Sequence, residues 1–307
     1  MSEIRYDGQV AVVTGAGNGI GRAHAKLLAA RGAKVIVNDL GGGVDGTGSS
    51  RSPAQQVVDE IRGDGGEAVP DFNTVATVDG AEAVVQTALD AYGRLDILVN
   101  NAGILRDKSF KNMSPEMFQA VIDVHLYGTV WICRAAWPVM YDTQQYGRII
   151  NTSSSSSLGN FGQTNYSAAK AGIIGFSRSL SVEGAKRNVK VNVLCPGGVT
   201  RMTEDLIGGF LQSQNISMDP EMVSPMVAYL AHRDCAYTGE IFAAAAGRYG
   251  RLFFGATPGY FNPQAAPEDV RDHIKQVMDP ADYVLCRSAA DEMQLMSKTK
   301  TGEPQPA

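Results

Sequence analysis

The sequence predicts an α/β protein with one doubly wound parallel sheet, and three observations support this prediction. Short apolar runs of strand length alternate with longer helical stretches from Val10 onward. A glycine-rich turn follows the first apolar run. Further polar or glycine-rich turns follow the later runs, and parallel sheets bind ligands beyond the carboxyl ends of their strands. The candidate functional residues are therefore expected at one edge of the sheet.

Composition excludes several classes of protein. The chain has 307 residues, of which 44% are apolar and 19% are charged, enough for one large domain with an ample core. The net charge of −5, the pI of about 5.4 and the lack of a long basic run argue against nucleic acid as a partner. The four cysteines form no C-x-x-C pair, which favours free thiols in a reducing compartment over disulfides or a zinc site.

Targeting and membrane signals are not evident. Residues 1–10 lack the charged-then-apolar layout of a signal peptide, and the C-terminal Gln-Pro-Ala is no peroxisomal address. No apolar run reaches the ~18 residues of a membrane-spanning helix. We therefore expect a cytoplasmic protein with no membrane partner.

The first strand, turn and helix predict a dinucleotide site. The apolar run 10–13 leads into the glycine-rich turn 14–21 and a helix that continues to Ala30. The glycines follow T-G-x-x-x-G-x-G and not G-x-G-x-x-G. A helix that begins behind such a turn presents free N–H groups and a positive dipole end to a pyrophosphate. The alternative, a plain glycine-rich turn, is disfavoured by the position directly after the first strand.

The predicted second strand is residues 34–39, and it ends at the acidic Asp39. A carboxylate at this strand end can accept hydrogen bonds from the adenosine ribose hydroxyls and would repel a 2′-phosphate. No arginine stands beside it, so we predict NAD and not NADP. The alternative is an aspartate that caps a local loop.

The remaining elements continue the alternation, and the segment 41–52 is predicted to be an exposed loop. The predicted strands are 67–72, 95–99, 148–152 and 189–194, and the predicted helices are 53–62, 81–91, 113–137 and about 166–185.

Tyr166 and Lys170 stand four residues apart, so they share one face of a helix. Lowering a phenol from its ordinary pKa of ~10 to about 7 requires ~4 kcal/mol. One cation about 4 Å away supplies roughly that at an effective dielectric constant near 20. Tyr166 is thus predicted to act as a general base near neutral pH. The alternative is a surface pair on an amphipathic helix.

Together, these motifs resemble the short-chain dehydrogenases/reductases over roughly residues 8–250. The matching elements are the turn 14–21, Asn-Asn-Ala-Gly at 100–103, a serine before the tyrosine, Tyr-x-x-x-Lys at 166–170 and Pro-Gly at 196–197. The resemblance implies a Rossmann-type sheet of about seven strands, a bound NAD(P), no metal, and oxidation of an alcohol or reduction of a ketone.

The resemblance also implies roles for particular residues. Tyr166 would accept the proton, Lys170 would lower its pKa and bind the nicotinamide ribose, and Ser154 would hydrogen-bond the substrate oxygen. Spacing to the tyrosine favours Ser153 instead, but strand register favours Ser154. The residues implied to bind the cofactor are Gly15, Asn18, Gly19, Ile20, Asp39, Thr74, Val75, Asn101, Gly103, Tyr166, Lys170, Pro196 and Val199.

His125 stands where most members of the family carry an asparagine that anchors a proton-relay water. It is therefore a catalytic candidate, since a histidine can hold a water and change charge near neutral pH. The alternative is a buried histidine whose ring is satisfied by a backbone carbonyl. Asn73 occupies a position that often holds an aspartate at the adenine.

A closer similarity is to the (3R)-hydroxyacyl-CoA dehydrogenase domains of peroxisomal multifunctional enzymes type 2, which are also described as 17β-hydroxysteroid dehydrogenases. It implies oxidation of a (3R)-3-hydroxyacyl-CoA by NAD. The alternatives are a dehydrogenase of a steroid or steroid-derived acyl-CoA, a reductase acting on acyl carrier protein, and a non-catalytic dinucleotide-sensing protein.

Residues 1–250 are predicted to form the dehydrogenase domain, with an apolar substrate lid at about 200–225. Residues 251–307 are predicted to be a C-terminal extension, disordered beyond about Lys298. The aromatic run 249–261 is expected to close the pocket or contact another subunit. By analogy with the family, we expect a homodimer or homotetramer.

Overall fold

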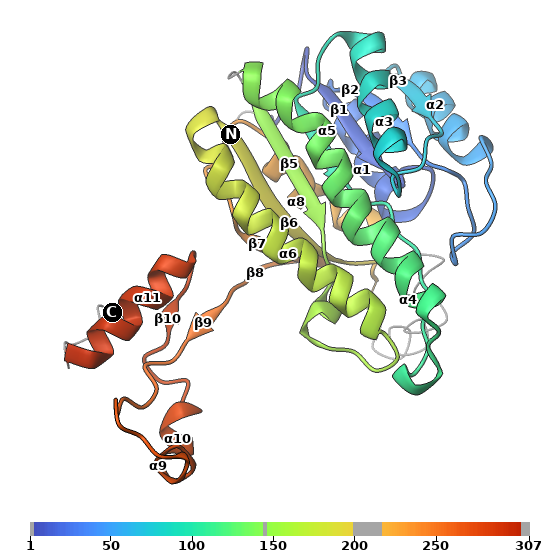
Figure 1. The fold of residues 1–307 in the computed structure, drawn as a ribbon. Helices are drawn as coiled ribbons and strands as arrows, with labels where there is room; N and C mark the ends of the chain where they lie inside the picture. The colour runs from blue at the N-terminus through green and yellow to red at the C-terminus, as the bar shows by residue number, and fades with distance from the viewer. Residues whose placement is uncertain (1–2, 144–145, 199–216, 302–307) are drawn as a thin grey trace. The chain divides into compact units, whose positions relative to one another are not determined.

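The main sheet of the computed structural model has eight strands among the residues that the structure describes, in the order β3-β2-β1-β4-β5-β6-β7-β8 (Figure 1). The structure describes residues 3–143, 146–198 and 217–301. All strand pairs from β3 to β7 are parallel. The strands are β1 (Val10–Thr14), β2 (Lys34–Asn38), β3 (Glu67–Asp71), β4 (Ile97–Asn100), β5 (Gly147–Thr152), β6 (Val189–Gly197), β7 (Ile241–Ala245) and β8 (Arg248–Leu252).

The strand order reverses between β1 and β4, which is the switch point at which such sheets bind ligands. The predicted doubly wound α/β fold is therefore confirmed. The eighth strand arises from a turn at Ala246 and Gly247, whose φ angles of 49° and 76° fit a tight hairpin after β7.

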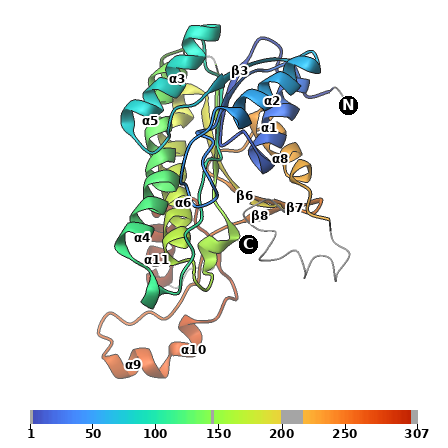
Figure 2. The same cartoon turned by 90° about the vertical axis from the view of Figure 1, so that its right-hand side faces the viewer.

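Helices cover both faces of the sheet, as the view along its edge shows (Figure 2). One layer contains α1 (Gly19–Ala30), α2 (Ser52–Gly63) and α8 (Ser224–Ala231). The other contains α3 (Val78–Tyr92), α5 (Gly128–Thr143) and α6 (Thr164–Gly184). The short α4 (Pro115–Val121) precedes α5, and 3-10 turns lie at η1 (Phe110–Asn112), η3 (Ser155–Leu158), η4 (Ala185–Arg187) and η5 (Pro220–Met222).

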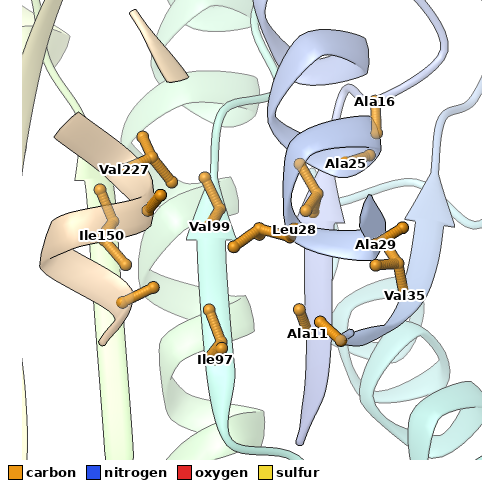
Figure 3. Packing of buried hydrophobic residues seen from close by; sticks show 14 of the residues in the cluster. Ala11, Ala16, Ala25, Leu28, Ala29, Val35, Ile97, Val99, Ile150 and Val227 are labelled. Carbon is orange, nitrogen blue, oxygen red and sulfur yellow. The ribbon is translucent and has the colours of Figure 1, made fainter. Parts of the chain in front are cut away.

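Each helix layer forms its own apolar core with the sheet. Figure 3 shows the first: Leu28 of α1 packs between β1 and β4, and Val227 of α8 lies over Ile150 of β5. Because both faces are covered, central strands such as β1 and β4 are buried along their whole length. This explains why they are continuously apolar and do not alternate.

The predicted helix 113–137 is interrupted. Ser114 caps α4 by accepting a hydrogen bond from the N–H of Met117, as its sequence signal predicts. The chain then widens into the π-helical segment η2 (Ile122–Tyr127) before α5 begins. Such segments are common at functional sites, and this one carries His125.

Contacts divide the chain into two units, residues 1–251 and residues 252–307. In the second unit β9 (Gly255–Ala256) pairs antiparallel with β10 (Val284–Leu285), and α9 (Pro267–Asp272), α10 (Ile274–Val277) and α11 (Ala289–Thr301) complete it. Phe253 stacks on Tyr283 with ring centroids 5.7 Å apart. The helix α11 runs past Lys298, where the sequence predicted disorder. No described helix is both long and apolar enough to cross a membrane.

Truncating Leu28 tests the first core. The side chain is 1% exposed, so Leu28→Ala should leave a cavity and lower the free energy of unfolding by about 2–5 kcal/mol. Urea denaturation measures this, with Leu158→Ala as the control because Leu158 is 76% exposed. A change at Leu28 as small as the control's would contradict the packing described.

Candidate active site

A cavity of about 360 Å³ lies at the carboxyl ends of β1 to β4. Most of its lining is backbone, glycine or small polar side chains, and Asp39 is the one charged residue among the described residues that line it. The lining residues are Gly15, Asn18, Gly19, Ile20, Gly21, Asn38, Asp39, Leu40, Gly42, Gly43, Val44, Gly46, Asn73, Thr74, Val75, Asn101, Ala102, Gly103, Ile104 and Val124.

The amino-terminal end of α1 opens into this cavity. Asn18 precedes the helix, and its side chain makes no capping hydrogen bond, so it leaves the first N–H groups of α1 to other partners. Gly15, Gly19 and Ile20 line the same wall. Uncapped N–H groups at a helix start, reached over glycines, fit the pyrophosphate of a dinucleotide. The residues present are thus those that a nicotinamide dinucleotide needs.

The Asp39 carboxylate is held in place by the backbone. Oδ2 accepts from the N–H of Gly17 at 2.7 Å, and Oδ1 accepts from the N–H of Gly41 at 2.7 Å. A Cβ at Gly17 would lie 2.8 Å from Oδ2, so only glycine permits this approach. These bonds cap local loops, as the alternative interpretation required, and they also fix a negative charge at the cavity wall.

The segment 41–52 is not the freely exposed loop that the sequence predicted. Gly42, Gly43, Val44 and Gly46 line the cavity. The segment is anchored because the N–H of Leu105 donates to the Val44 carbonyl at 2.9 Å and Arg106 Nε donates to the Asp45 carbonyl at 2.9 Å. Sequence reasoning missed these lining residues, since nothing in a glycine- and serine-rich run indicates what it packs against.

The wall near β3 is organised by Asp71, a buried carboxylate that sequence reasoning also missed. It accepts from Asn38 Nδ2 at 2.6 Å, from Asn73 Nδ2 at 2.8 Å and from Thr87 Oγ1 at 2.8 Å. Asn73 therefore turns its amide nitrogen away from solvent toward Asp71. The predicted Thr74 and Val75 line the cavity beside it.

Asn101 and Gly103 both line the cavity, but the Asn101 amide bonds to the backbone of the glycine-rich turn. Its Nδ2 donates to the carbonyls of Thr14 at 3.0 Å and Gly15 at 3.1 Å.

Pro196 lies inside β6 and pairs in register with Ala244, and it is not among the lining residues. The predicted strand end at Leu194 is thus three residues short of Gly197. Val199 and the lid residues up to 216 lie outside the described residues.

Tyr166 and Lys170 share one face of α6, as predicted, but the electrostatics differ from the sequence argument. Lys170 Nζ lies 5.5 Å from the Tyr166 ring centroid and donates to the Thr152 carbonyl at 2.6 Å. Burial lowers the pKa of Lys170 to about 7 and raises the pKa of Tyr166 to about 12. The prediction that this lysine alone brings the phenol near neutrality is therefore wrong, because burial disfavours both charges.

The two candidate serines occupy different environments. Ser153 is buried, and its Oγ donates to the Lys170 carbonyl at 2.8 Å. Ser154 precedes η3, and its Oγ accepts from the N–H of Ser156 at 3.1 Å. A hydrogen bond between the side chains of Ser154 and Tyr166 opposes the rise in the pKa of the phenol.

His125 is buried against the side chain of Tyr166. Its ring meets that of Tyr166 edge-on, with centroids 5.1 Å apart. Nε2 lies 2.8 Å from the Ile104 carbonyl oxygen and 2.9 Å from the Ile104 nitrogen. A Cβ at Gly103 would lie 2.3 Å from Cε1, so a glycine is required beside the ring.

Burial lowers the pKa of His125 to about 3, and the Lys170 charge acts in the same direction. The ring is therefore neutral at physiological pH, and the predicted change of charge near neutrality is wrong. The alternative, a ring held by the Ile104 backbone, accounts for Nε2. Nδ1 is buried and has no hydrogen-bond partner among the described residues, so the predicted contact with a water stays a prediction.

The fold and the site together define an oxidoreductase. A family model described as short chain dehydrogenase matches residues 9–207. The chain belongs to this family, whose members act on CH–OH groups and bind a nicotinamide dinucleotide.

Named relatives include peroxisomal multifunctional enzyme type 2 of Drosophila melanogaster. The chain is 52% identical to it over 246 residues, which are 80% of this chain and 40% of that protein. The solved full-length fly structure superposes with a TM-score of 0.77 at 39% identity, over 97% of this chain and 50% of that one. A short chain dehydrogenase from Mycobacterium avium superposes with a TM-score of 0.77 at 42% identity, over 90% of this chain and 97% of that one.

The Lys170 ammonium makes the stability of the cofactor-free protein depend on pH. Its pKa falls from 10.5 to about 7 on folding, so between these values the unfolded chain binds a proton that the folded chain does not. Stability therefore rises with pH across this window. Lys170→Met removes the titrating group, so only the Tm of the wild type should rise from this cause between pH 7 and pH 10. The Tm of the variant minus that of the wild type should therefore become less positive over this range. Exposed Lys186→Met is the control, and a flat difference at Lys170 would contradict the burial.

Proposed function

We propose that the protein is an NAD-dependent dehydrogenase that oxidises (3R)-3-hydroxyacyl-CoA to 3-ketoacyl-CoA. The observation that carries the proposal is the grouping of partly buried Tyr166 and Ser154 with buried Lys170, in a cluster where Tyr166 packs against Ile104 of the cavity wall. The similarity to multifunctional enzyme type 2 supports the choice of substrate class.

The chain's own residues supply proton transfer and orientation. Tyr166 accepts the substrate hydroxyl proton, and Ser154 hydrogen-bonds the same oxygen. Lys170, whose Nζ lies 5.5 Å from the Tyr166 ring centroid, would hold the nicotinamide ribose hydroxyls. The bound dinucleotide supplies a nicotinamide ring that accepts the hydride from the carbinol carbon.

The high pKa of Tyr166 in the cofactor-free protein has a consequence for the order of events. The phenol stays protonated until positive charge is added beside it, since a nearby cation favours the phenolate. The oxidised nicotinamide ring would supply such a cation, and Tyr166 would then act as a base.

The preference for NAD rests on Asp39. Its carboxylate is fixed by Gly17 and Gly41, and no lysine or arginine is among the described residues that line the cavity. A 2′-phosphate would therefore meet a fixed negative charge with no cation to offset it.

The predicted cytoplasmic location stays a prediction.

A steroid or steroid-derived thioester is the second candidate. Large apolar side chains stand exposed on the elements that carry the catalytic residues: Leu158 in η3 is 76% exposed, and Phe161 just before α6 is 90% exposed. Both an acyl chain and a steroid could cover such a surface.

The direct test offers the purified protein a 3-ketoacyl-CoA and a 17-ketosteroid, each with NADH and with NADPH, and follows cofactor absorbance. We expect fast oxidation of NADH with the thioester. Turnover of the steroid alone would favour the second candidate, and a preference for NADPH would contradict the role of Asp39. Tyr166→Phe should lower kcat by at least about a hundredfold with NADH affinity unchanged, because it removes only the proton acceptor.

We also propose a homo-oligomer. An apolar groove runs between α3, α5 and α6, lined by Trp131, Phe176 and Leu180 among others. Leu180→Glu places a charge there and should lower the mass measured by light scattering, whereas Gln55→Glu on exposed α2 should not. An unchanged mass for both variants would argue against this groove as the interface.

A further inference from the structure

The Gln163 side chain joins three separate parts of the catalytic centre. It is 6% exposed and directly precedes α6, which carries Tyr166 three residues later. Its Nε2 donates to Asp107 Oδ2 at 2.7 Å. Asp107 belongs to the segment 104–108 that follows the cavity wall, so this bond ties that segment to the start of α6.

The other end of the same amide holds the turn after β5. Gln163 Oε1 accepts from Ser156 Oγ at 2.9 Å and from Asn160 Nδ2 at 2.8 Å. Ser156 belongs to η3, and its own N–H donates to Ser154 Oγ. The amide thus reaches Ser154 through one intervening residue.

Further hydrogen bonds join the same parts of the chain. The N–H of Lys108 donates to the Gly162 carbonyl at 2.9 Å. Asn165 Nδ2 donates to the Arg106 carbonyl at 3.0 Å, and Asn165 Oδ1 accepts from the N–H of Tyr166 at 2.8 Å. Several hydrogen bonds therefore join the segment 104–108 to the start of α6, and of the side chains named here only Gln163 also bonds to η3.

We propose that Gln163 is a positioning residue of the catalytic centre, which sets the distance between Ser154 and Tyr166 and is itself oriented by Asp107. The proposal rests on the proposed catalytic roles of Ser154 and Tyr166. An amide suits this place because it donates at one end and accepts at the other, and Asp107 at one end with two donors at the other determine its orientation.

Asp107 also acts on the tyrosine directly. Its Oδ1 is buried without a hydrogen-bond partner among the described residues, which leaves its charge poorly compensated. That charge raises the pKa of Tyr166, as does Cys195, whereas Ser154 lowers it. The Asp107 carboxylate thus opposes deprotonation of Tyr166. Its hydrogen bond with Gln163 accounts for its place beside the tyrosine.

An exchange of the acid and the amide tests the proposal. Gln163→Glu faces Asp107 with a second carboxylate, and such a pair binds one proton at a raised pKa. Above that pKa the two groups repel and the turn carrying Ser154 shifts. We expect kcat at pH 8 to fall at least about tenfold, with recovery at lower pH, and NADH affinity to change less than about twofold, because Gln163 does not line the cavity.

The double variant Asp107→Asn/Gln163→Glu restores one donor and one acceptor in reversed order, so kcat should return to within about threefold of wild type. The control is Gln55→Glu, since Gln55 pairs with Asp59 at 2.8 Å on an exposed helix face where repulsion costs little. Gln163→Met keeps the side-chain volume and removes the hydrogen bonds, so it should lower kcat with near-normal KM. It replaces Gln163→Glu as the test variant if Gln163→Glu does not fold.

Two results would overturn the proposal: wild-type kcat in both Gln163 variants, or a double variant as slow as Gln163→Glu. Failure of the proposed function is distinct, because it appears as no turnover by the wild type. In that case the melting temperatures of the single and double variants still report whether Gln163 and Asp107 pair.

Discussion

The site depends on the hydrogen bonds of one short segment, residues 104–108. Its first residues bind the His125 ring and the Val44 carbonyl, and its last residues bind Gln163 and Gly162. It thereby joins the loop that lines the candidate cofactor cavity to the helix that carries Tyr166. None of these bonds is strong alone, but each satisfies a polar group that is at least partly buried, so loss of one leaves another group unpaired.

Burial is the second constraint, and it changes the chemistry that residue spacing implies. Spacing alone suggests an ion pair in which a lysine lowers the pKa of a tyrosine. In the folded chain the same burial raises the pKa of Tyr166 and lowers those of Lys170 and His125. Burial therefore disfavours the charged forms of all three side chains, and the proposed role of Tyr166 as a base requires positive charge beside it.

Much of the fold was predictable because strong local signals agreed with it. Continuous apolar runs mark strands covered on both faces, and Asp39 and the glycine turn stand where strand ends require them. The π-helical segment at His125 and the packing of the 41–52 segment were not predictable. Both contact the segment 104–108, which is distant in sequence, and neither has a periodic or compositional signature.

The sequence by itself determined the parallel sheet, the cavity wall at Gly15 to Ile20, and the shared helix face of Tyr166 and Lys170. These follow from period, spacing and chain order, which are local properties. Only the tertiary structure decided which serine contacts the tyrosine, that His125 is neutral, and that Gln163 joins Asp107 to Ser156. Those outcomes depend on dielectric environment and on partners far along the chain, and no sequence pattern carries either.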